Sequence, residues 1–129
     1  MMCGMQYSPK QFNIPSLEGI SERQVKVHLA LYEGYVKHVN LIMQTIQALK
    51  EAAKTADGGS PDGKPSRDAA GNAYIIAELR RRFAFEFDGM RMHEYYFTQW
   101  ENGSTALTTG GVLETALSKQ YGSMDAFLK

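Results

Sequence analysis

The sequence predicts an all-α protein built on a long antiparallel helical hairpin. Two segments carry apolar residues at steps of three or four, which is the spacing of one face of an α-helix. Between them lies a stretch rich in Gly, Pro, Asp and Ser that has no periodic apolar residues, as expected of a connection. No segment shows the pattern of a convincing strand. The expected order is therefore helix, connection, helix and a shorter helical segment.

The first helix is expected to begin near residue 21. Ser21 is followed three residues later by Gln24, which is a capping-box signature, and an apolar stripe starts directly after it. The stripe runs to about Ala53, so the helix is long and needs a partner to cover one face. That face is made of His28, Tyr32, Tyr35, Val39, Ile42, Ile46 and Leu49.

The second helix follows the Gly/Pro-rich loop, which is expected near residues 54–72. Gly89 lies within this helix and costs about 1 kcal/mol of helix propensity relative to Ala, so another group is expected to approach the backbone there. Asn102, Gly103 and Ser104 are expected to end the helix. The inward face is unusually aromatic and comprises Ile76, Leu79, Phe83, Phe87, Met90, His93, Phe97 and Trp100.

A shorter amphipathic segment follows the hairpin. It runs from Val112 to Tyr121, is closed by Gly122 as a C-cap, and restarts at Ser123 as an N-cap. We therefore expect a helical hairpin domain over residues 1–104 and a further helical segment over residues 105–129.

Composition limits the classes of function. The 129 residues suit one domain, and 43% hydrophobic residues suffice for a core without any run of bilayer-spanning length. The 14 basic and 14 acidic residues balance, which argues against a nucleic-acid partner. The basic run at residues 80–82, beside Glu78 and Glu86, is read as a solvated, ion-paired face. A single cysteine, Cys3, and the lack of a secretory signal pattern favour a cytoplasmic protein without a membrane partner.

Two histidines are the best clue to function. His28 lies early in the first helix and His93 late in the second, so an antiparallel hairpin brings them to the same end, where they can meet across the seam. Inward imidazoles from two packed helices are a way to hold a metal in an aromatic-walled pocket. A single histidine on an apolar stripe is more often a core residue, and His38 is expected at the surface. A di-iron carboxylate site is excluded, because Met90 stands three residues before His93 where such a site needs a glutamate.

These residues resemble the N-terminal part of the iron/manganese superoxide dismutases. The order of features matches that family: the segment IPSLEGIS at residues 14–21, then His28, then Tyr35 with Val36, then His93 followed by aromatic residues. Residues 110–129 resemble the first helix of the second domain of the family. The resemblance covers essentially the whole chain apart from the Gly/Pro-rich loop.

The resemblance implies a fold, an activity and a site. The fold would be the N-terminal helical hairpin of the family plus the first helix of a truncated or absent α/β second domain. The activity would be metal-dependent dismutation of superoxide to oxygen and hydrogen peroxide, with one iron or manganese ion per complete site. The implied residues are His28 and His93 as metal ligands, Tyr35 and Tyr32 as catalytic tyrosines, and Tyr96 and Phe97 as the pocket wall.

The sequence also departs from the family pattern. Tyr32 stands where the family has a second histidine, and Tyr35 comes seven residues after His28 instead of eight. Either the helix carries a local adjustment there, or the role of the tyrosine is shared between Tyr35 and Tyr32. Phe97 replaces the usual tryptophan. The Asp and His ligands of the second domain of the family have no counterpart before Lys129. Gly89 resembles the manganese-type pattern, yet the sequence alone does not choose between iron and manganese.

Because the chain contains only two of the metal ligands of the family, three functional hypotheses remain. The first is a superoxide dismutase that holds only two of its metal ligands in this chain. The second is a non-catalytic helical-hairpin interaction module, whose exposed apolar face favours a homo-oligomer. The third is one half of a split dismutase, which pairs with a complementing C-terminal half that carries the missing Asp and His.

Overall fold

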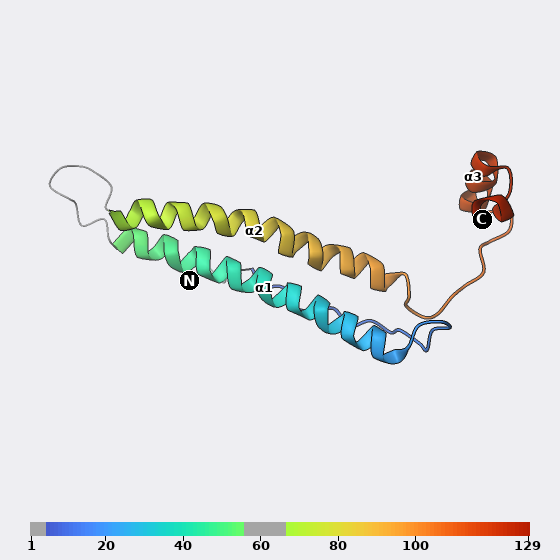
Figure 1. Cartoon of the computed structure of the whole chain (residues 1–129), viewed down its shortest axis with the longest axis horizontal. Coiled ribbons are helices and arrows are strands. Elements are labelled where there is room, and N and C mark those ends of the chain that lie inside the picture. Colours follow the sequence, from blue (N-terminus) through green and yellow to red (C-terminus); the bar gives the residue numbers. More distant parts are fainter. Residues whose placement is uncertain (1–4, 56–66) are drawn as a thin grey trace.

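Two long antiparallel helices form the body of the protein, and an extended N-terminal segment lies along them (Figure 1). A computed structural model describes residues 5–55 and 67–129; Cys3 lies outside these ranges. Over the described ranges the chain has no strand, only an isolated bridge between Leu17 and Ile20. The predicted all-α fold with a long helical hairpin is confirmed. The helices are α1 (Glu22–Thr55), α2 (Arg67–Thr98), α3 (Val112–Tyr121) and α4 (Met124–Phe127).

Helix α1 begins where the capping signature predicts. The backbone N–H of Gln24 donates to Ser21 Oγ over 3.2 Å, and the N–H of Val25 donates to the carbonyl of Ser21 over 3.1 Å. These bonds satisfy N–H groups that have no partner inside the helix. The start of the first helix could therefore be read from two residues.

The helices extend further into the predicted connection than the sequence pattern indicates. Helix α1 continues to Thr55 and α2 already begins at Arg67, whereas the loop was expected over residues 54–72. Residues 56–66 of that loop lie outside the described residues. Ala69, Ala70 and Ala73 explain the early start of α2, because alanine has the highest helix propensity even where no apolar stripe marks the face.

Helix α2 ends at Thr98, two residues before the end of its predicted stripe. The helix is followed by a tighter turn, in which the N–H of Trp100 donates to the carbonyl of Phe97, three residues earlier, over 3.0 Å. Asn102 and Gly103 both have positive φ values, 63° and 83°, which reverse the chain direction as their residue types favour.

The core follows the two predicted stripes. Burying each large apolar side chain contributes about 1.5–3 kcal/mol, so this small seam provides most of the hydrophobic stabilisation of the hairpin. Two glutamates of α2, Glu86 and Glu94, are buried in the same seam. The buried apolar residues are Tyr32, Val36, Val39, Ile42, Met90 and Phe97.

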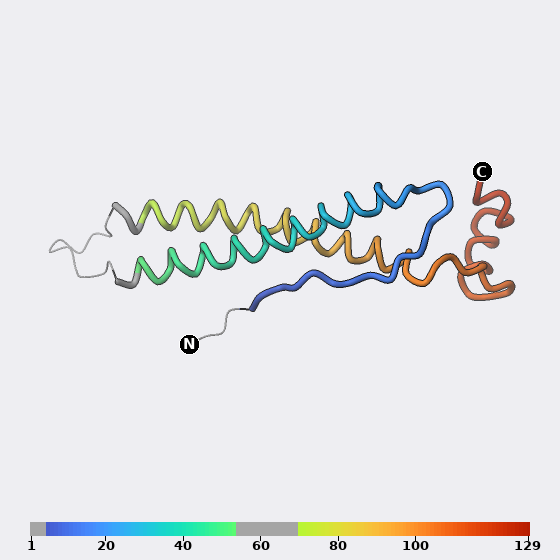
Figure 2. Tube along the Cα trace, turned by 90° about the horizontal axis from the view of Figure 1, so that it is seen from below, coloured from blue at the N-terminus to red at the C-terminus, as the bar shows by residue number. Residues whose placement is uncertain are grey.

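The extended residues 5–16, here called the N-terminal strap, run along the hairpin on the half near its open end (Figure 2). Near its start, Tyr7 and Asn40 exchange two hydrogen bonds of 2.9 and 2.8 Å. Near its end, Asn13 accepts at its carbonyl from the N–H of Asn102 over 3.0 Å. The ring of Phe12 packs in between against the core. The strap therefore closes one side of the seam between α1 and α2.

Helices α3 and α4 pack against each other and, within the described residues, neither packs against α1 or α2 (Figure 1). Both predicted caps are present: the N–H of Gly122 donates to the carbonyl of Ser118, and Ser123 Oγ accepts from the N–H of Ala126. Among the helices of the described ranges, none combines the length and the apolar character needed to cross a bilayer.

Candidate metal centre

The structure brings His28 and His93 together at the open end of the hairpin. Their ring centroids are 4.9 Å apart and the ring planes are nearly perpendicular, at 84°. A metal–nitrogen bond is about 2.1 Å long, so two imidazoles that bind one ion have ring centroids roughly 5 Å apart. A perpendicular arrangement at this distance is also usual for two aromatic rings in edge-to-face contact. The spacing therefore suits a shared ion without requiring one.

The orientation of His93 is set by the backbone of its own helix. Its Nδ1 lies 2.6 Å from the carbonyl oxygen of Gly89, one turn earlier. A carbonyl only accepts hydrogen bonds, so Nδ1 carries the proton and Nε2 keeps a free lone pair. Ligand histidines are commonly fixed in this way by a backbone carbonyl. Nε2 is therefore the available donor atom of His93.

Tyr35 packs directly over Gly89. A Cβ atom added to this glycine would lie 2.4 Å from Tyr35 Cε1, far inside van der Waals contact. The ring of Tyr35 is 5.1 Å from that of His93. The approach to the backbone that the sequence predicted at Gly89 is this tyrosine ring, which lies beside the histidine pair.

Tyr32 is fully buried, and its hydroxyl points to the strap. The hydroxyl accepts from the backbone N–H of Lys10 over 2.9 Å and donates to Glu94 Oε1 over 3.2 Å. Burial raises the pKa of Tyr32, and the nearby negative charge of Glu94 acts in the same direction. The ring stacks on His93 at a centroid distance of 6.5 Å and an angle of 20°. The ring of Tyr32 thus lies behind His93, while its hydroxyl is bonded to Lys10 and Glu94.

Phe97 and Tyr96 stand beside His28. The ring of Phe97 is fully buried, 4.9 Å from the ring of His28, and Tyr96 lies 5.2 Å from the same ring. An open pocket of about 260 Å³ is lined by His28, Met92, His93 and Tyr96. The two histidines are accordingly reachable through this pocket.

The chain offers two donors at this point. Among the residues that the structure describes, no group of three or more His, Cys, Asp or Glu side chains is placed to hold a metal ion. Iron and manganese bind nitrogen and oxygen donors, and imidazole suits the chemistry of this pair. The residues fit two positions of such an ion. His38, given no role from the sequence, is largely exposed and lies 3.4 Å from Glu86.

Sequence reasoning missed the two buried glutamates. Glu86 was read as part of a solvated face; the ion pair with Arg82 exists, but the carboxylate is buried in the seam. Glu94 lies next to His93 and receives bonds from Arg91, Lys10 and Tyr32. The spacing of Arg82 to Glu86 and Arg91 to Glu94 signals pairing along a helix. This spacing does not indicate that either glutamate is buried.

The charge on Glu94 is maintained despite its burial. Burial by itself raises the pKa of this carboxyl, but the bonds from Arg91, Lys10 and Tyr32 outweigh burial and hold the pKa below its usual range. Glu94 is therefore ionised at neutral pH, as three converging donors require.

The stability of the metal-free protein is expected to fall as the pH drops below about 6.5. Burial, followed by the charge of His93, lowers the pKa of folded His28 below its ordinary value of 6.5. The unfolded chain then binds more protons in this window, so stability is fully present above it and is lost as the pH falls through it. Chemical unfolding at about pH 7.5 and about pH 5.5 measures the change. A His28→Gln variant should show a flatter dependence than wild type; an unchanged dependence would contradict the assignment.

Comparison with known proteins gives one informative similarity. No protein-family model matches the chain, and no solved structure matches it. Among curated proteins it is similar to a superoxide dismutase [Fe] of Saccharolobus solfataricus, with 29% identity over 125 residues. The match covers 92% of this chain and 51% of the relative, so the chain spans about half the length of the curated relative it matches. The histidine pair thus lies in a helical hairpin that is distantly similar to part of an iron superoxide dismutase.

Proposed function

We propose that this chain is the helical-hairpin half of an iron- or manganese-dependent superoxide dismutase, in which His28 and His93 supply two of the metal ligands. The observation that carries the proposal is the perpendicular pair of imidazole rings 4.9 Å apart, one from each helix. The similarity to an iron superoxide dismutase over 92% of the chain supports it. Residues 105–129 would begin the second domain, and the remaining ligands would come from that domain or from a complementing chain.

The overall reaction would convert two superoxide ions and two protons into oxygen and hydrogen peroxide. When bound, the metal would supply the redox change between its trivalent and divalent states. His93 would present Nε2, because its Nδ1–H is held by the carbonyl of Gly89. Tyr35, whose ring lies beside His93, would hold a proton for the peroxide that forms. Phe97 and Tyr96 would limit access of water to His28.

Replacing either histidine with alanine should abolish stoichiometric metal binding. Substitutions that only disturb the orientation of a ligand typically weaken metal affinity about 10–100-fold, so losing the ligand itself should cost at least about tenfold. The test is metal analysis and superoxide dismutation for wild type, His28→Ala and His93→Ala. His38→Ala is the matched control, since His38 lies on the same helix away from the pair.

A wild-type protein that binds iron or manganese, with both variants deficient and the control normal, would support the proposed ligands. Dismutation with a complementing C-terminal half but not without it would identify a split enzyme. A well-folded protein that binds neither ion under either condition would overturn the proposal.

A helical-hairpin interaction module is the second candidate. Three apolar side chains near the histidine pair are unusually exposed: Val27 by 63%, Leu31 by 53% and Met92 by 60%. An exposed apolar cluster of this kind is typical of a surface that another protein covers. Sedimentation analysis of the metal-free chain distinguishes the two: self-association that persists in His28→Ala and without metal would favour the module.

A further inference from the structure

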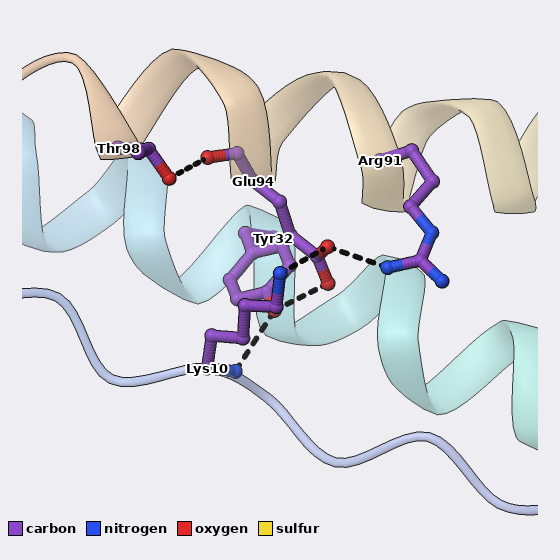
Figure 3. A network of polar contacts seen from close by, with 5 residues as sticks. All are labelled: Lys10, Tyr32, Arg91, Glu94 and Thr98. Carbon is purple, nitrogen blue, oxygen red and sulfur yellow. Dashed lines mark hydrogen bonds and ion pairs between the residues drawn. The ribbon is translucent and has the colours of Figure 1, made fainter.

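Glu94 joins three separate parts of the protein. Its carboxylate is 5% exposed and lies in α2, directly after His93. Figure 3 shows Arg91, Lys10 and Tyr32 around this carboxylate. Arg91 of the same helix lies at 2.8 Å, Lys10 Nζ of the strap at 3.1 Å, and the hydroxyl of Tyr32 in α1 at 3.2 Å. Both carboxylate oxygens are therefore engaged, and each additional partner comes from a different segment of the chain.

The hydroxyl of Tyr32 is the point where these segments meet. It receives the N–H of Lys10 from the strap and donates to Glu94, so it has a fixed donor and a fixed acceptor (Figure 3). A phenol held from both sides cannot swing without breaking a buried hydrogen bond, which costs about 1–3 kcal/mol when a partner is left unsatisfied. The position of the whole Tyr32 ring is set at its hydroxyl end.

The ring held in this way forms the back of the histidine pair. It lies nearly parallel to the ring of His93, at an angle of 20° and a centroid distance of 6.5 Å. It also lies 6.3 Å from the ring of Phe97, which itself packs against His28 at 4.9 Å. The strap adds Phe12, whose ring lies 5.8 Å from Tyr32 and 5.5 Å from Phe97. Movement of Tyr32 would consequently remove the support behind both imidazoles.

We infer that Glu94 is a positioning residue for the histidine pair, acting through Tyr32 and the N-terminal strap. It touches neither imidazole with its carboxylate in the contacts that the described residues make. It fixes the tyrosine ring behind His93, which adds to the hold of the Gly89 carbonyl on that imidazole. The inference deepens the proposed function and rests on it for the metal, whereas the positioning itself is a property of the metal-free protein.

The comparison of two buried glutamates tests the inference. Glu86 lies two turns earlier in α2 and is equally buried, but its partners are Arg82 and His38. Glu94→Gln keeps the size of the side chain and removes the charge that organises the network. Glu86→Gln makes the same chemical change outside that network, so it controls for the general cost of altering a buried carboxylate.

The first readout is exchange of the His93 Nδ1 proton, followed by nitrogen–proton NMR in the metal-free full chain. We expect Glu94→Gln and Tyr32→Phe each to accelerate exchange by about tenfold or more, with no further gain in the double variant, because the two residues act as one unit. Glu86→Gln should stay within about twofold of wild type. Equal effects of both glutamate variants, or independent addition of Glu94→Gln and Tyr32→Phe, would overturn the inference.

The second readout is titration with Co²⁺, followed by its visible absorption. A positioning role predicts that Glu94→Gln weakens Co²⁺ binding by about tenfold, the lower end of the range for residues that orient a ligand, while Glu86→Gln does not. If wild type binds no Co²⁺ either alone or with a complementing C-terminal half, the proposed function fails, and the proton-exchange result still decides the positioning. If wild type binds and Glu94→Gln changes neither readout, the positioning fails and the proposed ligands stand.

Discussion

Replacing Phe97 with alanine is expected to destabilise the protein by about 3–5 kcal/mol, a large part of the ~5–15 kcal/mol that holds a typical domain together. The ring is fully buried, and its removal would leave a cavity at the centre of the aromatic cluster. Chemical unfolding measures the loss. The rings around this cavity are those of Phe12, His28, Tyr32, His93, Tyr96 and Trp100.

Tyr95→Ala provides the matched control for Phe97→Ala. Tyr95 lies in the same turn of α2 but is 63% exposed, so its truncation removes an aromatic ring without opening a cavity. We expect this change to stay within about 0.5 kcal/mol of wild type, as surface substitutions usually do. A loss for Phe97→Ala no larger than that of Tyr95→Ala would mean that Phe97 is not at the centre of the core.

Gly89→Ala is expected to destabilise the protein, although alanine favours helices. The gain in helix propensity is about 1 kcal/mol, but the new Cβ would lie 2.4 Å from the ring of Tyr35, and forcing extra atoms into a packed site typically costs about 1–3 kcal/mol. The balance should be a net loss, together with a displaced tyrosine next to His93. Thermal and chemical unfolding measure the sign.

Two further variants isolate the cause. Gly34→Ala in α1 places its Cβ in open space, with nothing within 4 Å, so it should stabilise the protein by up to about 1 kcal/mol. In a Tyr35→Ala background the obstructing ring is gone, and Gly89→Ala should become stabilising as well. If Gly89→Ala stays destabilising without the ring, Tyr35 is not what requires glycine at this position.

The hairpin could be predicted because apolar residues at helical spacing mark the inward face of each helix. His28, Tyr32 and Tyr35 in α1, and Met90, His93 and Phe97 in α2, recur at helical spacing, and each of them is buried or half-buried. Val36 is buried as well, although the predicted face does not include it. The start of α2 was placed too late because alanine-rich residues at its beginning form a helix without an apolar stripe. Local sequence patterns thus predicted the inward faces of the two helices better than they predicted where the helices begin and end.

The surroundings of the candidate site were harder to foresee. That His28 and His93 lie together follows from antiparallel helices, since one is early and the other late. The strap has no periodicity, and its partners at Asn40 and Asn102 are contacts that no local pattern encodes. Burial of Glu94 depends on Lys10 and Tyr32 arriving from other segments, so its spacing to Arg91 alone looks like an ordinary surface pair.

The strap is synthesised early but reaches its final contacts late. Asn13 is synthesised early, yet its side-chain amide donates to Asn102, 89 positions later in the chain. At roughly 5–20 residues per second, a ribosome needs about 4–18 s to make that interval. Until α2 has been made, the strap can contact only α1, at Asn40 and Tyr32. The strap leaves the ribosome before either helix and is therefore among the last segments to dock, and the polar network around Glu94 closes only after both helices have been translated and paired.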